Sequence, residues 1–232
     1  MTDPGTGGGL APDEPFDGPC ALDDPNVKLA TPAPGAPRLE PARTAIGDSQ
    51  RWLLSFYRSS EISGALFFGR LARAQRPGPI QQDLTRHFAD EAQHARYWTD
   101  CLDELGVAPL KLGVAYQDQY LSAAGMPANL MEVLAITSVF ERRVINQYAR
   151  HLTVAELEPA VIGTLNKIME DERWHISWVR KALKDMGSEY GSDHIKATIR
   201  RFEQADREVY AATIREHEER TSFILDRVGV SR

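Results

Sequence analysis

The chain has 232 residues, of which 42% are hydrophobic and 26% charged, and these are ordinary values for a globular protein. Its net charge of −6 argues against a nonspecific nucleic-acid binder, and no apolar run is long enough to predict a membrane span. The first residues lack a secretory signal, and two cysteines, Cys20 and Cys101, are too few for a disulfide framework, an iron–sulfur cluster or a rubredoxin-like site. We therefore expect a cytoplasmic protein.

Residues 1–45 are expected to form a disordered tail. They contain nine of the 14 prolines and six of the 17 glycines, and their few apolar residues show no periodicity. Such a segment buries too little surface to offset the entropy lost when it becomes ordered. Within it, residues 23–29 (DDPNVKL) have the most distinctive side chains, and docking to a partner protein is the alternative role for the tail.

The pattern becomes helical after residue 47. It predicts one helix over residues 48–75, with Asp48 or Ser49 as its N-cap, and a second over residues 80–105. The sequence RPGP at positions 76–79 separates the two helices, because neither proline nor glycine continues a helix well. The two helices are therefore expected to form a hairpin.

A second hairpin is predicted further along the chain. It consists of a helix over residues 129–152 and another over residues 158–186, with Pro159 at the first helical position and Gly187 as the stop. A last segment, residues 193–228, also has a helical composition. The chain is thus expected to contain two helical hairpins followed by one more helix.

Residues 107–128 join the two hairpins. This connection is too long for a tight turn, and its 22 residues are long enough, when extended, to span the length of the helices. The expected organisation is a tail over residues 1–45, a four-helix bundle over residues 46–188 and a C-terminal helical extension over residues 189–232.

The most informative pattern is a Glu-x-x-His motif that occurs twice, at 91–94 and at 172–175. Residues three apart lie on the same face of a helix, so each motif points two metal-binding side chains the same way. Glu61 precedes the first motif by 30 residues, and Glu141 precedes the second by 31. The midpoints of these intervals fall at the breaks between helices, so the side chains of each hairpin lie level, about 22 Å from its turn at 1.5 Å per residue.

Four carboxylates and two imidazoles are thus expected to converge among apolar neighbours. A single motif on a solvated helix face would mean little, but buried carboxylates are costly unless they are paired or bound to a cation. The pattern predicts a dinuclear metal site, with Glu91 and Glu172 as bridges. Oxygen and imidazole ligands suit iron or manganese. The predicted ligands are Glu61, Glu91 and His94 for one metal ion, and Glu141, Glu172 and His175 for the other.

Four further residues are candidates to support these ligands. Asp90 and Asp171 each precede a motif, and a carboxylate commonly accepts a hydrogen bond from a metal-bound histidine. Each aspartate is expected to serve the histidine of the opposite helix, with plain surface charge as the alternative. Tyr57 and Tyr148 lie on the same helices as the lone glutamates, and packing in the core is the commoner role for such tyrosines. Lining a pocket or taking part in redox chemistry is the alternative for both.

The motif set resembles the ferritin-like superfamily of di-iron carboxylate proteins over residues 48–187. This resemblance implies an all-α fold, a ferritin-like four-helix bundle of two antiparallel hairpins, to which this chain adds a C-terminal helix. It also implies that residues 107–128 form a long crossover, because the second and third helices of such a bundle run parallel. Bacterioferritin, rubrerythrin and the small di-iron oxygenases look alike at these ligands. The chain lacks the cysteines of rubrerythrin, and Gln93 and Trp174 stand where the oxygenases and desaturases usually have arginine before the histidine. The subfamily is therefore left open.

The resemblance implies a metal centre of two iron ions, with manganese or a mixed manganese–iron pair as alternatives. The leading hypothesis is an O2-activating oxidoreductase, an oxygenase, oxidase or desaturase, that acts on an organic substrate. Its electrons would come from a separate reductase or ferredoxin, because the chain has no flavin, iron–sulfur or nicotinamide motif. The alternative is a ferroxidase for iron storage or detoxification. A homo-oligomer, a dimer or larger, is expected in either case.

Overall fold

A computed structural model of the chain describes residues 46–112, 116–217 and 220–221. All the regular elements in these ranges are helices, so the predicted all-α class is confirmed for them. The predicted tail, with its possible docking segment at residues 23–29, lies outside the described residues. No helix in the described ranges combines the length and the apolar character needed to cross a membrane.

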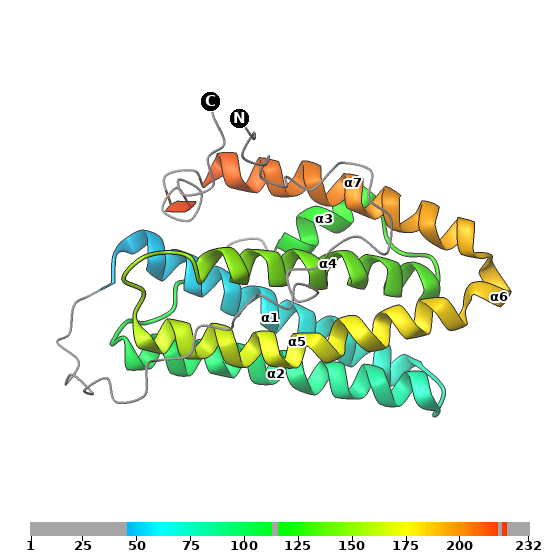
Figure 1. Cartoon of the computed structure of the whole chain (residues 1–232), viewed down its shortest axis with the longest axis horizontal. Coiled ribbons are helices and arrows are strands. Elements are labelled where there is room, and N and C mark those ends of the chain that lie inside the picture. The colour runs from blue at the N-terminus through cyan, green and yellow to red at the C-terminus, as the bar shows by residue number, and fades with distance from the viewer. Residues whose placement is uncertain (1–45, 113–115, 218–219, 222–232) are drawn as a thin grey trace, which may run out of the picture.

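The first hairpin consists of α1 (Asp48–Ala74) and α2 (Pro79–Glu104), which run antiparallel (Figure 1). The predicted N-cap of α1 is wrong: Gly47 takes the cap position with extended backbone, and no side chain caps the helix. Asp48 instead lies in the first turn, where its negative charge interacts favourably with the helix dipole. Helix α2 starts with Pro79, because proline needs no hydrogen-bond acceptor in the first turn.

The second hairpin consists of α4 (Leu130–His151) and α5 (Pro159–Asp185). Side chains cap the start of α4: Asn129 accepts a hydrogen bond from the Glu132 amide, and the Glu132 carboxylate accepts one from the Ala128 amide. Both helices lie within two residues of their predicted bounds. Helices α2 and α4 run in the same direction, so the connection between the hairpins spans the length of the bundle (Figure 1).

Two features beyond the hairpins differ from expectation. The connection contains a helix, α3 (Tyr116–Ala124), which the sequence pattern did not predict. Gly187 does not stop the helical path: it begins the single turn α6 (Gly187–Tyr190), and the chain turns at Gly191, where φ is +80°. Glycine reaches that conformation without the strain that a Cβ would cause, so the reversal occurs there.

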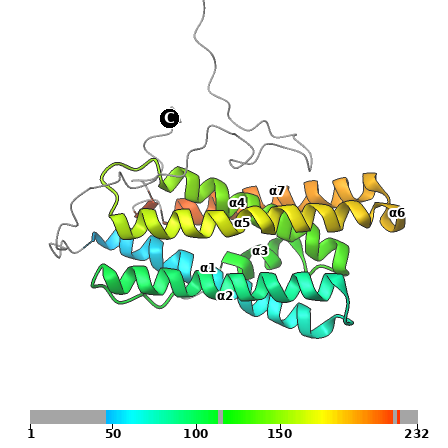
Figure 2. The same ribbon diagram turned by 60° about the horizontal axis from the view of Figure 1, so that its bottom comes forward.

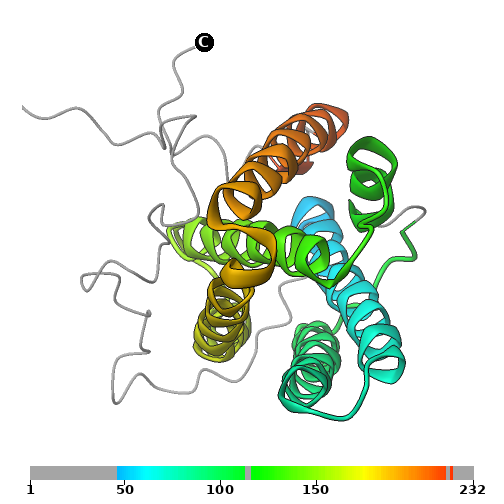
Figure 3. The same cartoon turned by 90° about the vertical axis from the view of Figure 1, so that its right-hand side faces the viewer.

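Helix α7 (Ser192–Glu216) then packs along the outside of α4. Ile195, Ile199 and Phe202 are buried in the same apolar cluster as the neighbouring side chains of α4. Arg143 of α4 also donates through Nε to Asp206 of α7 at 2.8 Å. The predicted C-terminal helix thus covers the bundle as far as Glu216, and residues 222–232 lie outside the described ranges. Figure 3 shows α7 and α3 outside the bundle that α1, α2, α4 and α5 form, on the side of α1 and α4.

Two apolar clusters fill the bundle, one toward each end. The first lies around Leu84, Leu134 and Phe202, and the second around Trp98 and Leu165. Between them the four long helices present polar side chains at mid-length, where the two hairpins face each other as layers (Figure 2). The apolar clusters hold the hairpins together and leave the polar middle to the predicted ligands.

Candidate metal centre

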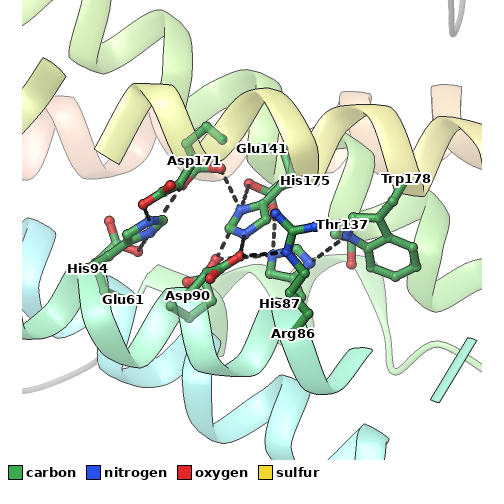
Figure 4. Close-up of polar contacts among 12 residues, drawn as sticks. Glu61, Arg86, His87, Asp90, His94, Thr137, Glu141, Asp171, His175 and Trp178 are labelled. Atoms are coloured by element: carbon green, nitrogen blue, oxygen red, sulfur yellow. Dashed lines mark hydrogen bonds and ion pairs between the residues drawn. The ribbon is translucent and has the colours of Figure 1, made fainter. Parts of the chain in front are cut away.

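All six predicted ligands converge at the middle of the bundle. Helices α1 and α4 each contribute one glutamate, and α2 and α5 each contribute one Glu-x-x-His pair (Figure 4). Every one of these side chains is buried. The antiparallel geometry therefore puts the six side chains at the same height of the bundle, as the spacing within each hairpin predicted.

The side chains form two groups that could each hold a metal ion. In each group, one ligand atom per residue lies within 4.8 Å of all the others. Glu91 belongs to both groups, which is the position of a bridge. The Glu172 oxygens face both groups as well, with Oε1 at 3.4 Å from His94 Nδ1 and Oε2 at 2.8 Å from His175 Nδ1. The groups are Glu61, Glu91, His94 and Glu172, and His87, Glu91, Glu141 and His175.

The grouping of Glu172 differs from the predicted one. It was assigned with His175, whereas the structure groups one of its oxygens with Glu61, Glu91 and His94. The reason is that its two oxygens point to opposite sides, one toward His94 and the other toward His175. Its place between His94 and His175 agrees with the bridging role expected from the sequence.

The two aspartates lie beside the histidines of the opposite hairpin. Asp171 Oδ2 is 3.4 Å from His94 Nε2, and Asp90 Oδ2 is 3.4 Å from His175 Nε2 (Figure 4). In both histidines Nδ1 faces the carboxylates at the centre. An aspartate that holds the outer N–H leaves the inner nitrogen with a lone pair, which is the form that binds a metal.

Glu61 accepts a hydrogen bond from a neutral donor, the phenol of Tyr148. The Tyr148 hydroxyl donates to Glu61 Oε1 at 2.5 Å, and Trp98 Nε1–H donates to the Tyr148 oxygen at 3.2 Å. Burial and the charge of Glu61 raise the pKa of Tyr148 well above its usual range, so the phenol keeps its proton. Tyr57 packs against Tyr148, with ring centroids 4.8 Å apart, and both tyrosines line the cavity that reaches the glutamates, as the alternative role from the sequence allowed.

His87 is a buried residue of the centre that the sequence analysis missed. It lies one turn before Glu91 on α2, and its Nε2 is 3.1 Å from Glu91 Oε1 and 3.1 Å from Glu141 Oε1. Its ring is stacked between Phe68 and His175, with centroid distances of 3.8 and 3.7 Å. The spacing of His87 and Glu91, four residues apart on one helix face, was the signal that could have identified it.

Trp178 determines which nitrogen of His87 carries the proton. The Trp178 indole Nε1–H donates to His87 Nδ1 at 3.2 Å (Figure 4), and an indole nitrogen can only donate. Burial, together with repulsion from His175, lowers the pKa of His87, so the ring is neutral. Its single N–H is therefore on Nε2 and points at Glu91 and Glu141. In this form His87 holds two carboxylates as a hydrogen-bond donor, and neither of its ring nitrogens has a lone pair free for a metal ion.

A glycine on α1 makes room for the bridging carboxylate. A Cβ on Gly64 would lie 2.4 Å from Glu91 Oε2, which is closer than atoms can approach without displacement. Glycine inside a helix costs about 1 kcal/mol relative to alanine. This cost is offset here by the close approach of α1 to the Glu91 side chain.

The glutamates at the centre repel one another. Burial, followed by repulsion from Glu61 and Glu141, raises the pKa of Glu91 well above its usual range. Burial also raises the pKa of Glu172 to about 8, and Glu141 adds to that rise. Four ionised carboxylates at this spacing need nearby positive charge, which divalent cations would supply. The donor set of carboxylate oxygens and imidazole nitrogens could therefore hold metal ions, and it suits iron or manganese.

A cavity of about 360 Å³ reaches the carboxylates from the side of α1 and α4. All four central glutamates contribute to its lining, and so do Leu121 of α3 and Tyr210 of α7. Its size is in the range of pockets that bind small organic molecules. The walls are mainly aromatic and aliphatic and include Phe56, Phe67, Phe68, Ile136, Phe140 and Val144.

Known proteins add no family to this description. The chain matched no protein-family model, no curated protein and no solved structure. Its function is therefore inferred from the residues of the centre and from the cavity beside them.

Proposed function

We propose that this protein is an O2-activating di-iron oxidoreductase of the ferritin-like type, an oxygenase, oxidase or desaturase, that acts on an organic substrate. The observation that supports this proposal is the largely apolar cavity that ends at the four central glutamates. A ferroxidase must admit hydrated iron ions continuously. An aromatic wall disfavours such ions, because it removes their water and offers no polar group in its place. The same wall stabilises an organic molecule, whose apolar surface is removed from water.

The six predicted ligands would hold the two iron ions, and the same donors fit manganese or a mixed pair. The bound ions would supply the electrons that reduce O2, and a separate reductase or ferredoxin would restore them. The chain itself would position the reactants. Tyr148 holds Glu61 and His87 holds Glu141, and we call these two the outer glutamates. The apolar cavity keeps bulk water from the substrate.

Anaerobic loading with Fe(II), followed by exposure to O2, tests the proposal. Iron oxidised and retained should stop near two ions per chain. Glu172→Gln should abolish this uptake, whereas Glu170→Gln, an exposed neighbour on the same helix, should leave it unchanged. Continued oxidation, with the iron retained as a mineral well beyond two per chain, would contradict the proposal and would establish the storage function instead.

A further inference from the structure

We propose that the cavity takes an amphipathic organic anion, with its apolar body between α1 and α4 and its anionic group at Arg70. This inference rests on the proposed function, because it names the substrate class of the same site. It combines the path of the cavity around α1 with the charges along that path.

The lining of the cavity includes residues from the core face of α1 and from its outer face. Buried Glu61 marks the inner end, exposed Leu66 and Arg70 mark the outer end, and half-buried Gly64 and Phe67 lie on the flank between them. Nine residues make two and a half helical turns, so Arg70 lies on the side of α1 opposite Glu61. Leu66 is 59% exposed, which marks the outer end as the mouth.

The walls between these two ends favour an apolar body. Phe67 and Phe68 of α1 line the cavity together with Ile136, Phe140 and Val144 of α4. Aromatic side chains stack favourably on flat or alkyl groups of a ligand, and none of the five carries a charge. A ligand that fills this part of the cavity is therefore apolar along most of its length.

The cationic residues of the lining are Arg70 and Arg143, and they differ in their partners. Arg143 is committed to buried Asp206, and its guanidinium lies 3.9 Å from the centre of the Tyr210 ring. Arg70 is exposed, and across the described parts of the chain it forms no ion pair. Its charge is therefore available to a ligand. A guanidinium pairs with a carboxylate through two parallel hydrogen bonds, so a carboxylate is the best-matched anionic group.

The separation of the two ends sets the length of the ligand. Arg70 lies about 13 Å beyond Glu61 along the helix axis, at 1.5 Å per residue. Helical side chains lean toward the N-terminus, which brings the guanidinium back over the mouth. A molecule with its anionic group at Arg70 and its far end at the glutamates is thus elongated, with one charged end.

Three probes that differ only in their end group test the inference. They are 6-phenylhexanoate, 6-phenylhexan-1-ol and 6-phenylhexylamine, titrated calorimetrically into the full chain without O2, both as purified and after Mn(II) loading. The carboxylate should bind at least about tenfold more tightly than the alcohol, and the amine most weakly, as expected for one charge-assisted pair. Arg70→Gln should reduce the carboxylate to the affinity of the alcohol, whereas Arg73→Gln, exposed on the same helix outside the cavity, should change nothing.

Equal binding of the three probes, or no loss with Arg70→Gln, would overturn the inference. A second variant, Val144→Phe, should fill the cavity and weaken all three probes, with circular dichroism to check folding, and unchanged binding would show that the probes bind elsewhere. Because no O2 is present, these results are independent of the iron count. Anion-selective binding together with iron mineralisation would reject the proposed function alone, and non-selective binding with uptake of two irons would reject the inference alone.

Discussion

The two hairpins carry the same ligand pattern but support it with different groups. Glu61 of the first hairpin accepts a hydrogen bond from Tyr148 of the second. Glu141 of the second hairpin faces the Nε2–H of His87 of the first. Each outer glutamate is therefore held by a donor from the other hairpin, but one donor is a phenol and the other an imidazole.

The positions that correspond in the repeat explain this difference. Phe68 follows Glu61 by seven residues, as Tyr148 follows Glu141, and a phenyl ring has no group to donate. Ile168 precedes Glu172 by four residues, as His87 precedes Glu91, and it has no donor either. The first hairpin therefore has no phenol to hold Glu141, and the second has no imidazole to hold Glu61.

Each of the two donors is anchored by a tryptophan N–H. Trp98 donates to Tyr148 and Trp178 donates to His87, although the two tryptophans are not equivalent positions in the repeat. The repeated part of the centre is thus the set of predicted ligands, and the supporting groups follow the packing of each half. The two metal positions are therefore expected to differ chemically, and substitutions at the centre can test how far they differ.

The largest effect is expected from the bridging glutamate. Glu91→Gln should abolish the binding of both metal ions, because Glu91 belongs to both groups. Glu61→Gln should mainly abolish the binding of one metal ion, because Glu61 belongs to one group. Metal content after Mn(II) or Fe(II) loading, measured by elemental analysis, distinguishes the two outcomes. Equal losses from both variants would mean that the two positions fill only together.

Gly64→Ala should weaken metal binding by roughly 10- to 100-fold, the range typical for groups that orient a ligand. The new Cβ would push Glu91 out of place, whereas the equivalent position of the second hairpin holds Val144. The metal-free protein should become slightly more stable, because alanine favours a helix by about 1 kcal/mol. Gly163→Ala on α5, where nothing lies within 4 Å, is the matched control and should affect stability alone.

His87→Phe and Tyr148→Phe each remove one donor to an outer glutamate, and each should weaken metal binding by about tenfold. His87→Phe is expected to have the larger effect, because His87 faces two carboxylates and Tyr148 holds one. Competition titrations with a chelator would rank His87→Phe against Tyr148→Phe. A larger effect of Tyr148→Phe would mean that the phenol dominates the support of the centre.

Trp178→Phe should change what binds the metal more than how tightly it is bound. Without the indole N–H, the proton of His87 can move to Nδ1, and Nε2 can then offer a lone pair to a metal ion. Pulsed electron paramagnetic resonance of the Mn(II)-loaded protein should then count three histidine nitrogens in place of two. If three are already present in the unchanged protein, Trp178 does not control the tautomer.

The last effect is expected outside the centre and without a change in metal binding, at His151, which stands where the first hairpin has Leu71. Burial lowers the pKa of His151 to about 4, whereas an unfolded histidine has a pKa of about 6.5. The unfolded chain therefore binds the extra proton first, so stability is lost as the pH falls from about 6.5 to 4, by up to about 3 kcal/mol. His151→Leu should remove this part of the pH dependence, measured by urea unfolding at pH 7.5 and pH 5. Parallel pH profiles would contradict the assignment.

The sequence by itself determined the helices of both hairpins and the convergence of the six predicted ligands. Periodicity and breaking residues set the ends of α1, α2, α4 and α5, because those signals are local. Two side chains equidistant from a turn must lie level in an antiparallel pair, so the spacing of Glu61, Glu91, Glu141 and Glu172 was sufficient to bring them to one height. That the two hairpins pack with these levels facing each other was expected only from the resemblance to the ferritin-like bundles.

The tertiary structure alone decided the rest. The spacing of His87 and Glu91 could mark His87 as a candidate, but its tautomer depends on Trp178, which is 91 residues away in the chain. Gly64 matters because α1 passes close to Glu91, and the cavity exists because α3 and α7 add walls beside α1 and α4. These features depend on which side chains meet across helices, and such contacts leave no periodic trace along the chain.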